Sequence, residues 1–238
     1  MKRDIIILHG WGLDGSRFTP LKTELEKRGA RVWAPDFPGF GSAKNPQAPY
    51  HLFEYAMFLR DFMKKYKIQN PGFIGHSFGG RVALKYDFLF PKSVRWIVLT
   101  GTPGFRSSSS LKVSLGIAIV KLGKYFVSLP LMKNFKNSIT QSYYSFIGVQ
   151  GYGRAQGTMK DTFKYIVSEP LESYMKSLSV PCLLLWGELD TLVPTQIAVR
   201  MHNAIPNSTV SIIRGFGHSV PYTSPYDFVR LMKQHNFI

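Results

Sequence analysis

Residues 75–80 have the sequence GHSFGG and separate a short apolar strand, predicted at 73–75, from a helix predicted to run from Ser77 to about Phe90. The pattern G-x-S-x-G between a strand and a helix is typical of a sharp turn that raises a serine hydroxyl above the end of a sheet. Glycine relieves the crowding of such a turn because it has no Cβ. A serine that only caps the helix is the simpler alternative. The spacing of the glycines, which a cap does not need, favours Ser77 as a nucleophile.

Strand and helix patterns alternate on both sides of this segment. Short apolar runs, which predict strands, occur at 4–8, 31–35, 73–75, 94–99, 180–186 and 209–213. Helical periodicity occurs at 18–28, 52–66, 77–90, 195–204 and 225–235. Strands that alternate with helices form parallel sheets with both faces covered. The sequence therefore predicts an α/β fold with about six, mostly parallel strands.

The alternation stops after Pro103 and resumes near residue 173. Between these points the chain has a polar run at 107–110 and then helical segments punctuated by lysines. We therefore expect residues 1–103 and 173–238 to form the α/β core and residues 104–172 to form a helical cap, or lid, inserted into it. Aromatic residues of the core and the insertion are candidates for a substrate pocket: Trp11, Phe78, Tyr143, Tyr144 and Phe146.

A serine hydroxyl needs a base, and the base needs an orienting group. On this kind of fold the chain order is serine, then an acid, then histidine. Asp190 follows the strand predicted at 180–186, and His218 follows the last predicted strand. Both positions lie at the carboxyl edge of the sheet, where ligands bind in open α/β sheets. We predict Ser77, Asp190 and His218 as a catalytic triad, with Glu188 as the rival acid.

Acyl chemistry also needs hydrogen-bond donors for the oxyanion that develops. The backbone N–H of Phe78, which follows the nucleophile, is one expected donor. The loop after the first strand, with the sequence HGWG at 9–12, should supply the other. The flanking glycines let its backbone turn inward, which favours the N–H of Trp11. His9 is expected to shape this loop rather than to react.

These motifs together resemble the α/β-hydrolase superfamily, and the resemblance covers nearly the whole chain. It is carried by HGWG at 9–12, DFPGFG at 36–41, GHSFGG at 75–80, WGELD at 186–190 and GH at 217–218. The opening HGWGL is similar to that of pimeloyl-carrier-protein methyl ester esterases and related carboxylesterases. This chain departs from those esterases in having His76 and Phe78 where they commonly have Trp and Leu. It also lacks the residues for the antiparallel strand pair with which the superfamily usually begins, so we expect that hairpin to be missing.

The resemblance implies a serine carboxylic ester hydrolase that acts through an acyl-enzyme, on short to medium acyl esters. Lactone, thioester and carbon–carbon bond hydrolysis use the same triad and stay open as alternatives, and cofactor-free haloperoxidases and perhydrolases share it. A non-catalytic binding module of the same fold is a further alternative. Neither a metal nor an organic cofactor is expected. The glycine-rich segments lack the lysine and the spacing of a phosphate-binding loop.

The 238 residues carry a net charge of +16, with 30 Lys and Arg against 14 Asp and Glu. Residues 88–160 contain ten basic residues and no acidic one. Such a segment suggests that this part of the chain binds an anionic carrier or a lipid surface. A solvated helix face is an equally simple explanation for the basic residues. Charge alone raises nucleic acid as a partner, but no binding motif supports it. One cysteine, no apolar run of membrane-spanning length and no secretory segment favour a cytoplasmic protein.

Overall fold

The computed structural model describes residues 3–105 and 157–238. Residues 1–105 and 157–238 form one compact unit. Residues 157–172, which we assigned to the insertion, thus belong to the same compact unit as the core. Most of the predicted cap, including Tyr143, Tyr144 and Phe146, lies outside the described residues. The division of the chain into a core and a cap at 104–172 therefore stays a prediction.

Six strands form one sheet in the order β2-β1-β3-β4-β5-β6, and every neighbouring pair is parallel. The strands are β1 (Asp4–Leu8), β2 (Arg31–Trp33), β3 (Gly72–His76), β4 (Trp96–Thr100), β5 (Cys182–Gly187) and β6 (Ser208–Ile213). All residues of β1, β3, β4 and β5 are buried, as the continuous apolar runs indicated. The predicted fold class is confirmed, and no antiparallel strand pairs with the described sheet.

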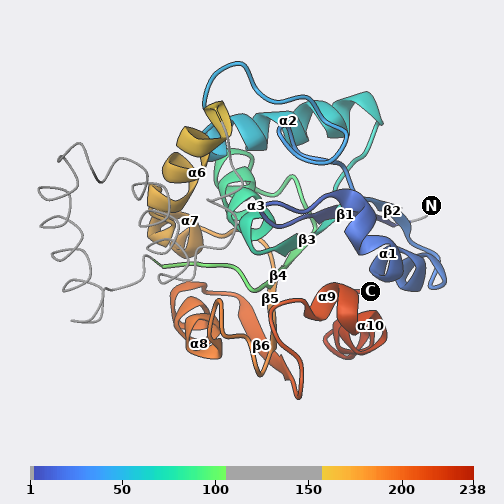
Figure 1. Cartoon of the computed structure of the whole chain (residues 1–238). Helices are drawn as coiled ribbons and strands as arrows, with labels where there is room; N and C mark the ends of the chain where they lie inside the picture. The colour runs from blue at the N-terminus through green and yellow to red at the C-terminus, as the bar shows by residue number, and fades with distance from the viewer. Residues whose placement is uncertain (1–2, 106–156) are drawn as a thin grey trace, which may run out of the picture. The chain divides into compact units, whose positions relative to one another are not determined.

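Helices cover both faces of this sheet (Figure 1). One face packs on α1 (Thr19–Glu26), α9 (Val220–Thr223) and α10 (Pro225–Gln234), whose apolar residues share a core with Ile5, Ile74 and Val98. Successive side chains of a strand point to opposite faces. Phe73 therefore points away from that core, and its ring packs on Tyr86 with centroids 5.2 Å apart. Tyr86 belongs to α3 (Phe78–Leu89), which packs beside α2 (Leu52–Lys65).

The remaining described helices follow in the second half of the chain. They are α6 (Thr158–Ser168), α7 (Glu172–Lys176) and α8 (Thr195–Ala204). Two details differ from the sequence prediction. The helix expected at 18–28 is α1, and an unpredicted 3₁₀ turn, η1 (Gly15–Phe18), precedes it, where Asp14 accepts a hydrogen bond from the Ser16 N–H at 2.9 Å. The short helix α9 was not predicted, since four residues are too few to show a period.

Candidate active site

Ser77 is the single residue between β3 and α3, and its backbone has φ 52° and ψ −112°. Residues other than glycine rarely adopt such a φ, so the backbone of this turn is strained. The Ser77 N–H donates to the carbonyl of Thr100 at 2.9 Å, which holds the turn against β4. A Cβ on Gly75 would lie 2.6 Å from Cα of Gly80, and one on Gly79 would lie 2.1 Å from the carbonyl oxygen of Leu8. The glycine spacing therefore has a steric cause.

The structure brings Asp190 and His218 together. Nδ1 of His218 lies 2.8 Å from Oδ2 of Asp190. The other carboxylate oxygen accepts the backbone N–H groups of Leu192 at 3.0 Å and Val193 at 2.8 Å. These bonds aim Oδ2 at the imidazole, and the Asp190 side chain is only 1% exposed. The rival acid Glu188 instead accepts the N–H of Gly215 at 3.0 Å.

The imidazole of His218 lies beside the segment that holds the Ser77 turn. A Cβ on Gly101 would lie 2.6 Å from Cε1 of His218 and 3.4 Å from Oδ2 of Asp190. Gly101 directly follows Thr100, whose carbonyl accepts the Ser77 N–H. Among the described residues, no hydrogen bond joins the Ser77 hydroxyl to His218. Catalytic hydrogen bonds are often long in structures without substrate and shorten when it binds.

His76, the residue before Ser77, is 1% exposed and packs against His218 with ring centroids 4.8 Å apart. Its ring also contacts Phe18 and Tyr222. Burial, and then the nearby charge of His218, hold the pKa of His76 well below its ordinary value. His76 therefore stays neutral and gives one side of His218 an aromatic wall.

The loop after β1 is held by His9, which is fully buried. Its Nε2 accepts the N–H of Phe37 at 3.0 Å, and its Nδ1 lies 2.9 Å from the carbonyl of Gly10. Since a carbonyl only accepts, the proton must sit on Nδ1. Burial lowers the pKa of His9, which favours this neutral form. His9 thus ties the Trp11 loop to the loop at 36–41, whose Asp36 accepts bonds from Gly15 and Ser42.

Trp11 and Phe78, the two expected oxyanion donors, lie close together, with ring centroids 5.6 Å apart. The Trp11 N–H donates to no residue that the structure describes. Phe78 is the first residue of α3, and the first N–H groups of a helix lack partners within it. The Trp11 ring also packs edge-on against Phe40 at 4.8 Å and Phe163 at 4.9 Å. Sequence patterns missed Phe40, because a single aromatic residue in a loop has no periodicity.

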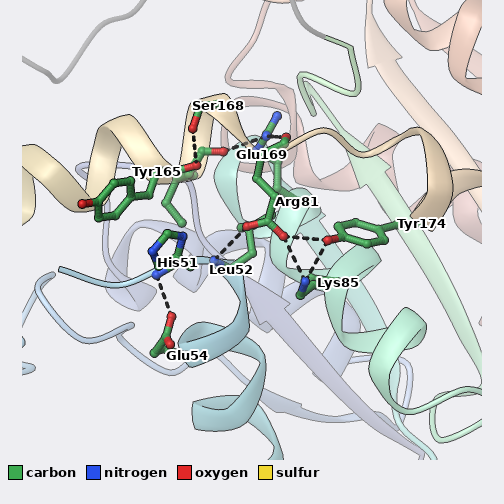
Figure 2. Close-up of polar contacts among 10 residues, drawn as sticks. His51, Leu52, Glu54, Arg81, Lys85, Tyr165, Ser168, Glu169 and Tyr174 are labelled. Carbon is green, nitrogen blue, oxygen red and sulfur yellow. Dashed lines mark hydrogen bonds and ion pairs between the residues drawn. The ribbon is translucent and has the colours of Figure 1, made fainter.

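Two basic residues of α3 form a polar network with later parts of the chain (Figure 2). The first of them, Arg81, is four residues after Ser77 in the sequence. The guanidinium of Arg81, which is 5% exposed, donates to the carbonyls of Pro103 at 2.7 Å, Ile166 at 2.7 Å and Glu169 at 2.6 Å. One turn later, Lys85 donates to the Glu169 carboxylate at 3.0 Å and to the Tyr174 hydroxyl at 2.7 Å. Arg81 thus fastens the segment after β4 and the end of α6 to the helix that follows Ser77. This role of Arg81 was not predicted from the sequence.

Within residues 3–105 and 157–238, no group of three or more His, Cys, Asp or Glu side chains is arranged to hold a metal ion. In the same ranges, no helix has the length and apolar character needed to cross a membrane.

Comparison with known proteins identifies the family. The sequence model of the family described as "alpha/beta hydrolase fold" matches residues 5–225. The chain belongs to the α/β-hydrolase family. A pimeloyl-[acyl-carrier protein] methyl ester esterase from Shewanella woodyi is 28% identical over 247 residues, which cover 94% of this chain and 90% of that protein. The resemblance drawn from the motifs is therefore confirmed.

Solved structures show the same fold. An esterase from Exiguobacterium antarcticum has a TM-score of 0.74 at 20% identity, covering 98% of this chain and 91% of that one. A bromoperoxidase from Bacillus anthracis has a TM-score of 0.72 at 18% identity, covering 98% and 91%. This α/β-hydrolase chain is a hydrolase enzyme, since its named sequence relatives are esterases, a lipase and hydrolases. The structural neighbours have different activities, so the fold alone does not choose the reaction.

Proposed function

We propose that this α/β hydrolase cleaves carboxylic esters through Ser77, His218 and Asp190. The observation that carries the proposal is the 2.8 Å contact between His218 Nδ1 and Asp190 Oδ2, beside the strained turn that presents Ser77. A carboxylate on Nδ1 leaves Nε2 free to accept a proton, which is the tautomer that a general base needs. The esterase relatives support the choice of an ester.

The reaction would proceed in two halves. Ser77 Oγ attacks the ester carbonyl carbon while His218 Nε2 takes the hydroxyl proton, and the carbonyl oxygen becomes an oxyanion. The backbone N–H groups of Trp11 and Phe78 donate to that oxyanion. When the intermediate collapses, the bond to the leaving oxygen breaks and His218 gives its proton to the alcohol. Water then attacks the acyl-enzyme with His218 as base, which releases the acid and restores Ser77.

Asp190 stabilises the imidazolium that forms in each half. Its carboxylate is held by two backbone N–H bonds and is almost fully buried, so it stays aimed at His218 while the charge develops. The aromatic rings of Trp11, Phe40, Phe78 and Phe163 pack together as an apolar cluster beside the expected oxyanion donors. Apolar surroundings of this kind favour a short to medium acyl chain as the acid part of the ester. Lactone, thioester and carbon–carbon bond hydrolysis on the same residues are the alternatives.

Ser77→Ala tests the proposal directly. We expect the variant to lose turnover of p-nitrophenyl butyrate and labelling by a fluorophosphonate probe, while its circular dichroism spectrum matches that of the wild type. Ser177→Ala, a change at an exposed serine at the end of α7, is the matched control and should keep both activities. Full turnover by Ser77→Ala would show that another residue is the nucleophile. A folded wild type that the probe does not label would favour the non-catalytic binding module.

A panel of substrates separates the alternative reactions. An ester, a lactone, a thioester and a carbon–carbon substrate of similar acyl size would be compared by kcat/KM. We expect the ester to be the best substrate, because the sequence relatives include a lipase and a methyl ester esterase. A higher kcat/KM for any other member would move the assignment to that reaction.

A further inference from the structure

A cavity of about 370 Å³ lies at the opposite edge of the sheet from Ser77. Arg3, Ala30 and Arg95, which line it, immediately precede β1, β2 and β4. Ser77 and Asp190 instead follow the carboxyl ends of β3 and β5. Because all six strands are parallel, these two sets of residues lie at opposite edges. The proposed ester hydrolysis makes no use of this cavity.

The floor of the cavity is apolar. It includes Ile5 and Leu25, each 1% exposed, and Trp96, which is 7% exposed. The ring of Phe237 also lines it and packs edge-on against Trp96, with centroids 5.6 Å apart. Small-molecule pockets have volumes of about 300–1,000 Å³ and are mostly apolar with a few polar groups. The cavity therefore has the size and lining of a small-ligand site.

Gly29, Ala30 and Ile238 also line the cavity, and four cationic residues complete the lining: Arg3, Arg28, Arg95 and Lys233. Arg28 is paired with Glu24 at 3.0 Å. In the part of the chain that the structure describes, Arg3, Arg95 and Lys233 have no ion pair. The charge of Asp4 acts on Arg95, but the Asp4 carboxylate already accepts two hydrogen bonds from Arg31. Among the described residues, no acidic side chain pairs with these three cations, so their positive charge stays at the cavity.

The guanidinium of Arg95 is partly buried, and its buried Nε–H group has no hydrogen-bond partner among the described residues. Burial, followed by the charge of nearby Arg3, lowers the pKa of Arg95. A buried donor without an acceptor destabilises the protein, and like charges repel. An anion in the cavity would relieve both effects.

We propose that this cavity binds a small amphipathic carboxylate, with the carboxylate at Arg95 and Lys233 and a medium-length apolar chain over Leu25, Trp96 and Phe237. The cations select the negative head, and the apolar floor selects a chain, so neither a simple inorganic anion nor an alcohol satisfies both parts. The site is distinct from the one proposed for ester hydrolysis, and the proposal does not depend on that activity.

Titration of the wild-type protein with octanoate at low salt tests the proposal by calorimetry. Butyrate keeps the charge and shortens the chain, whereas 1-octanol keeps the chain and removes the charge. We expect octanoate to bind about tenfold more tightly than either. Amide chemical-shift changes in a ¹⁵N spectrum should cluster at Gly29, Ala30 and Phe237. Changes confined to the surroundings of Ser77 and His218 would overturn the proposal, as would equal affinity for butyrate.

Variants give a second, independent measurement. Arg95→Gln/Lys233→Gln should weaken octanoate binding about tenfold, whereas Arg95→Lys should bind within about twofold of the wild type. Lys64→Gln/Lys176→Gln removes two exposed charges elsewhere and is the matched control. An equal loss in the control would mean that only net charge matters and would overturn the site. Lys233 is exposed, so Lys233→Gln alone should fold normally and still weaken binding about threefold. Unchanged affinity in that variant contradicts the proposal.

Discussion

At the scale of single residues, Gly101 occupies a position beside His218 that only glycine fits. Its φ is +55°, and an added Cβ would lie 2.6 Å from Cε1 and 2.7 Å from Nδ1 of the imidazole. Real Cβ atoms do not approach so closely, so His218 must move or the backbone must shift. Nothing in the sequence GTPG at 101–104 indicates contact with a histidine 117 positions later.

We therefore expect Gly101→Ala to lower kcat/KM for p-nitrophenyl butyrate by about 100-fold, since a displacement of about 1 Å of a catalytic group has an effect of that order. Steady-state kinetics check this, with circular dichroism to verify the fold. Gly29→Ala is the matched control, because Gly29 also has a positive φ, +83°, but open space around its Cβ position. If both variants keep wild-type kcat/KM, the imidazole does not depend on Gly101.

His9 and His76 make stability depend on pH. Burial lowers the pKa of each below the ordinary value of 6.5 in the folded protein. Below that pH these histidines bind protons in the unfolded chain but stay neutral in the folded protein. The free energy of unfolding therefore falls as pH falls. Each histidine contributes at most about 1.4 kcal/mol per pH unit. Above pH 6.5 neither form is protonated at these sites, so their contribution is constant.

Urea unfolding between pH 5 and 8 measures this dependence. We expect the free energy of unfolding to decline steeply below about pH 6.5, and the slope to be smaller in His76→Asn, which cannot titrate there. His202→Asn is the control, because His202 lies on the exposed side of α8. A slope that His76→Asn leaves unchanged would mean that His76 titrates in the folded protein as it does in the unfolded chain.

At the scale of helices and strands, Arg81 links α3, the helix that follows Ser77, to the segment after β4 and to the end of α6. Replacing Arg81 by Met would remove the donors of three carbonyls, those of Pro103, Ile166 and Glu169. We expect Arg81→Met to lower the free energy of unfolding by about 2–4 kcal/mol, because hydrogen bonds from a charged donor to buried acceptors are strong. Urea unfolding followed by tryptophan fluorescence measures it.

Lys85→Met serves as the comparison for that variant. Lys85 is on the same helix, but its partners are a carboxylate and a hydroxyl that also bond to one another. Its removal leaves those groups paired, so we expect a loss of about 1 kcal/mol. A loss for Lys85→Met as large as that for Arg81→Met would show that Arg81 has no special place in this network.

Most elements were predictable because their signal is local. Continuous apolar runs marked β1, β3, β4 and β5, and periodicity marked α2 over Leu52–Lys65 and α8 over Thr195–Ala204. The Arg81 contacts were not predictable, since Ile166 and Glu169 are 85 and 88 positions away. In the sequence, a single arginine of a helix looks the same whether its side chain faces water or three carbonyl groups.

At the scale of the whole molecule, the order of motifs predicted more than any one motif did. A serine turn, an acid after one strand and a histidine after the last strand only make sense if parallel strands bring their carboxyl ends to one edge. The sheet has that arrangement, and His218 and Asp190 are in contact. The order of motifs along the chain does not give distances between side chains. The close approach of Gly101 to His218 and the packing of His76 against His218 could therefore not be predicted from it.

The uneven charge leads to a prediction about substrates. The net charge is +16, and residues 88–160 have no acidic residue, so anionic esters should be attracted to the protein. We expect kcat/KM for the anionic ester p-nitrophenyl hemisuccinate to fall severalfold when NaCl rises from about 0.05 M to about 0.5 M, because the screening length shortens well below 10 Å. The neutral ester p-nitrophenyl butyrate should change less than about twofold and is the control. Equal salt dependence for both esters would speak against electrostatic attraction of the substrate.

The pairing of β4 with β5 has a consequence for how this chain could have changed over time. The two strands are neighbours in the sheet, yet β4 ends at Thr100 and β5 begins at Cys182. The entropic cost of joining two strands through a connecting segment grows only with the logarithm of the segment's length, about 0.6 kcal/mol for each doubling. A change of length that keeps the Arg81 contacts with Pro103, Ile166 and Glu169 therefore hardly alters the free energy of forming the sheet. Natural selection can resize that segment while the edge that carries Ser77, Asp190 and His218 stays as it is.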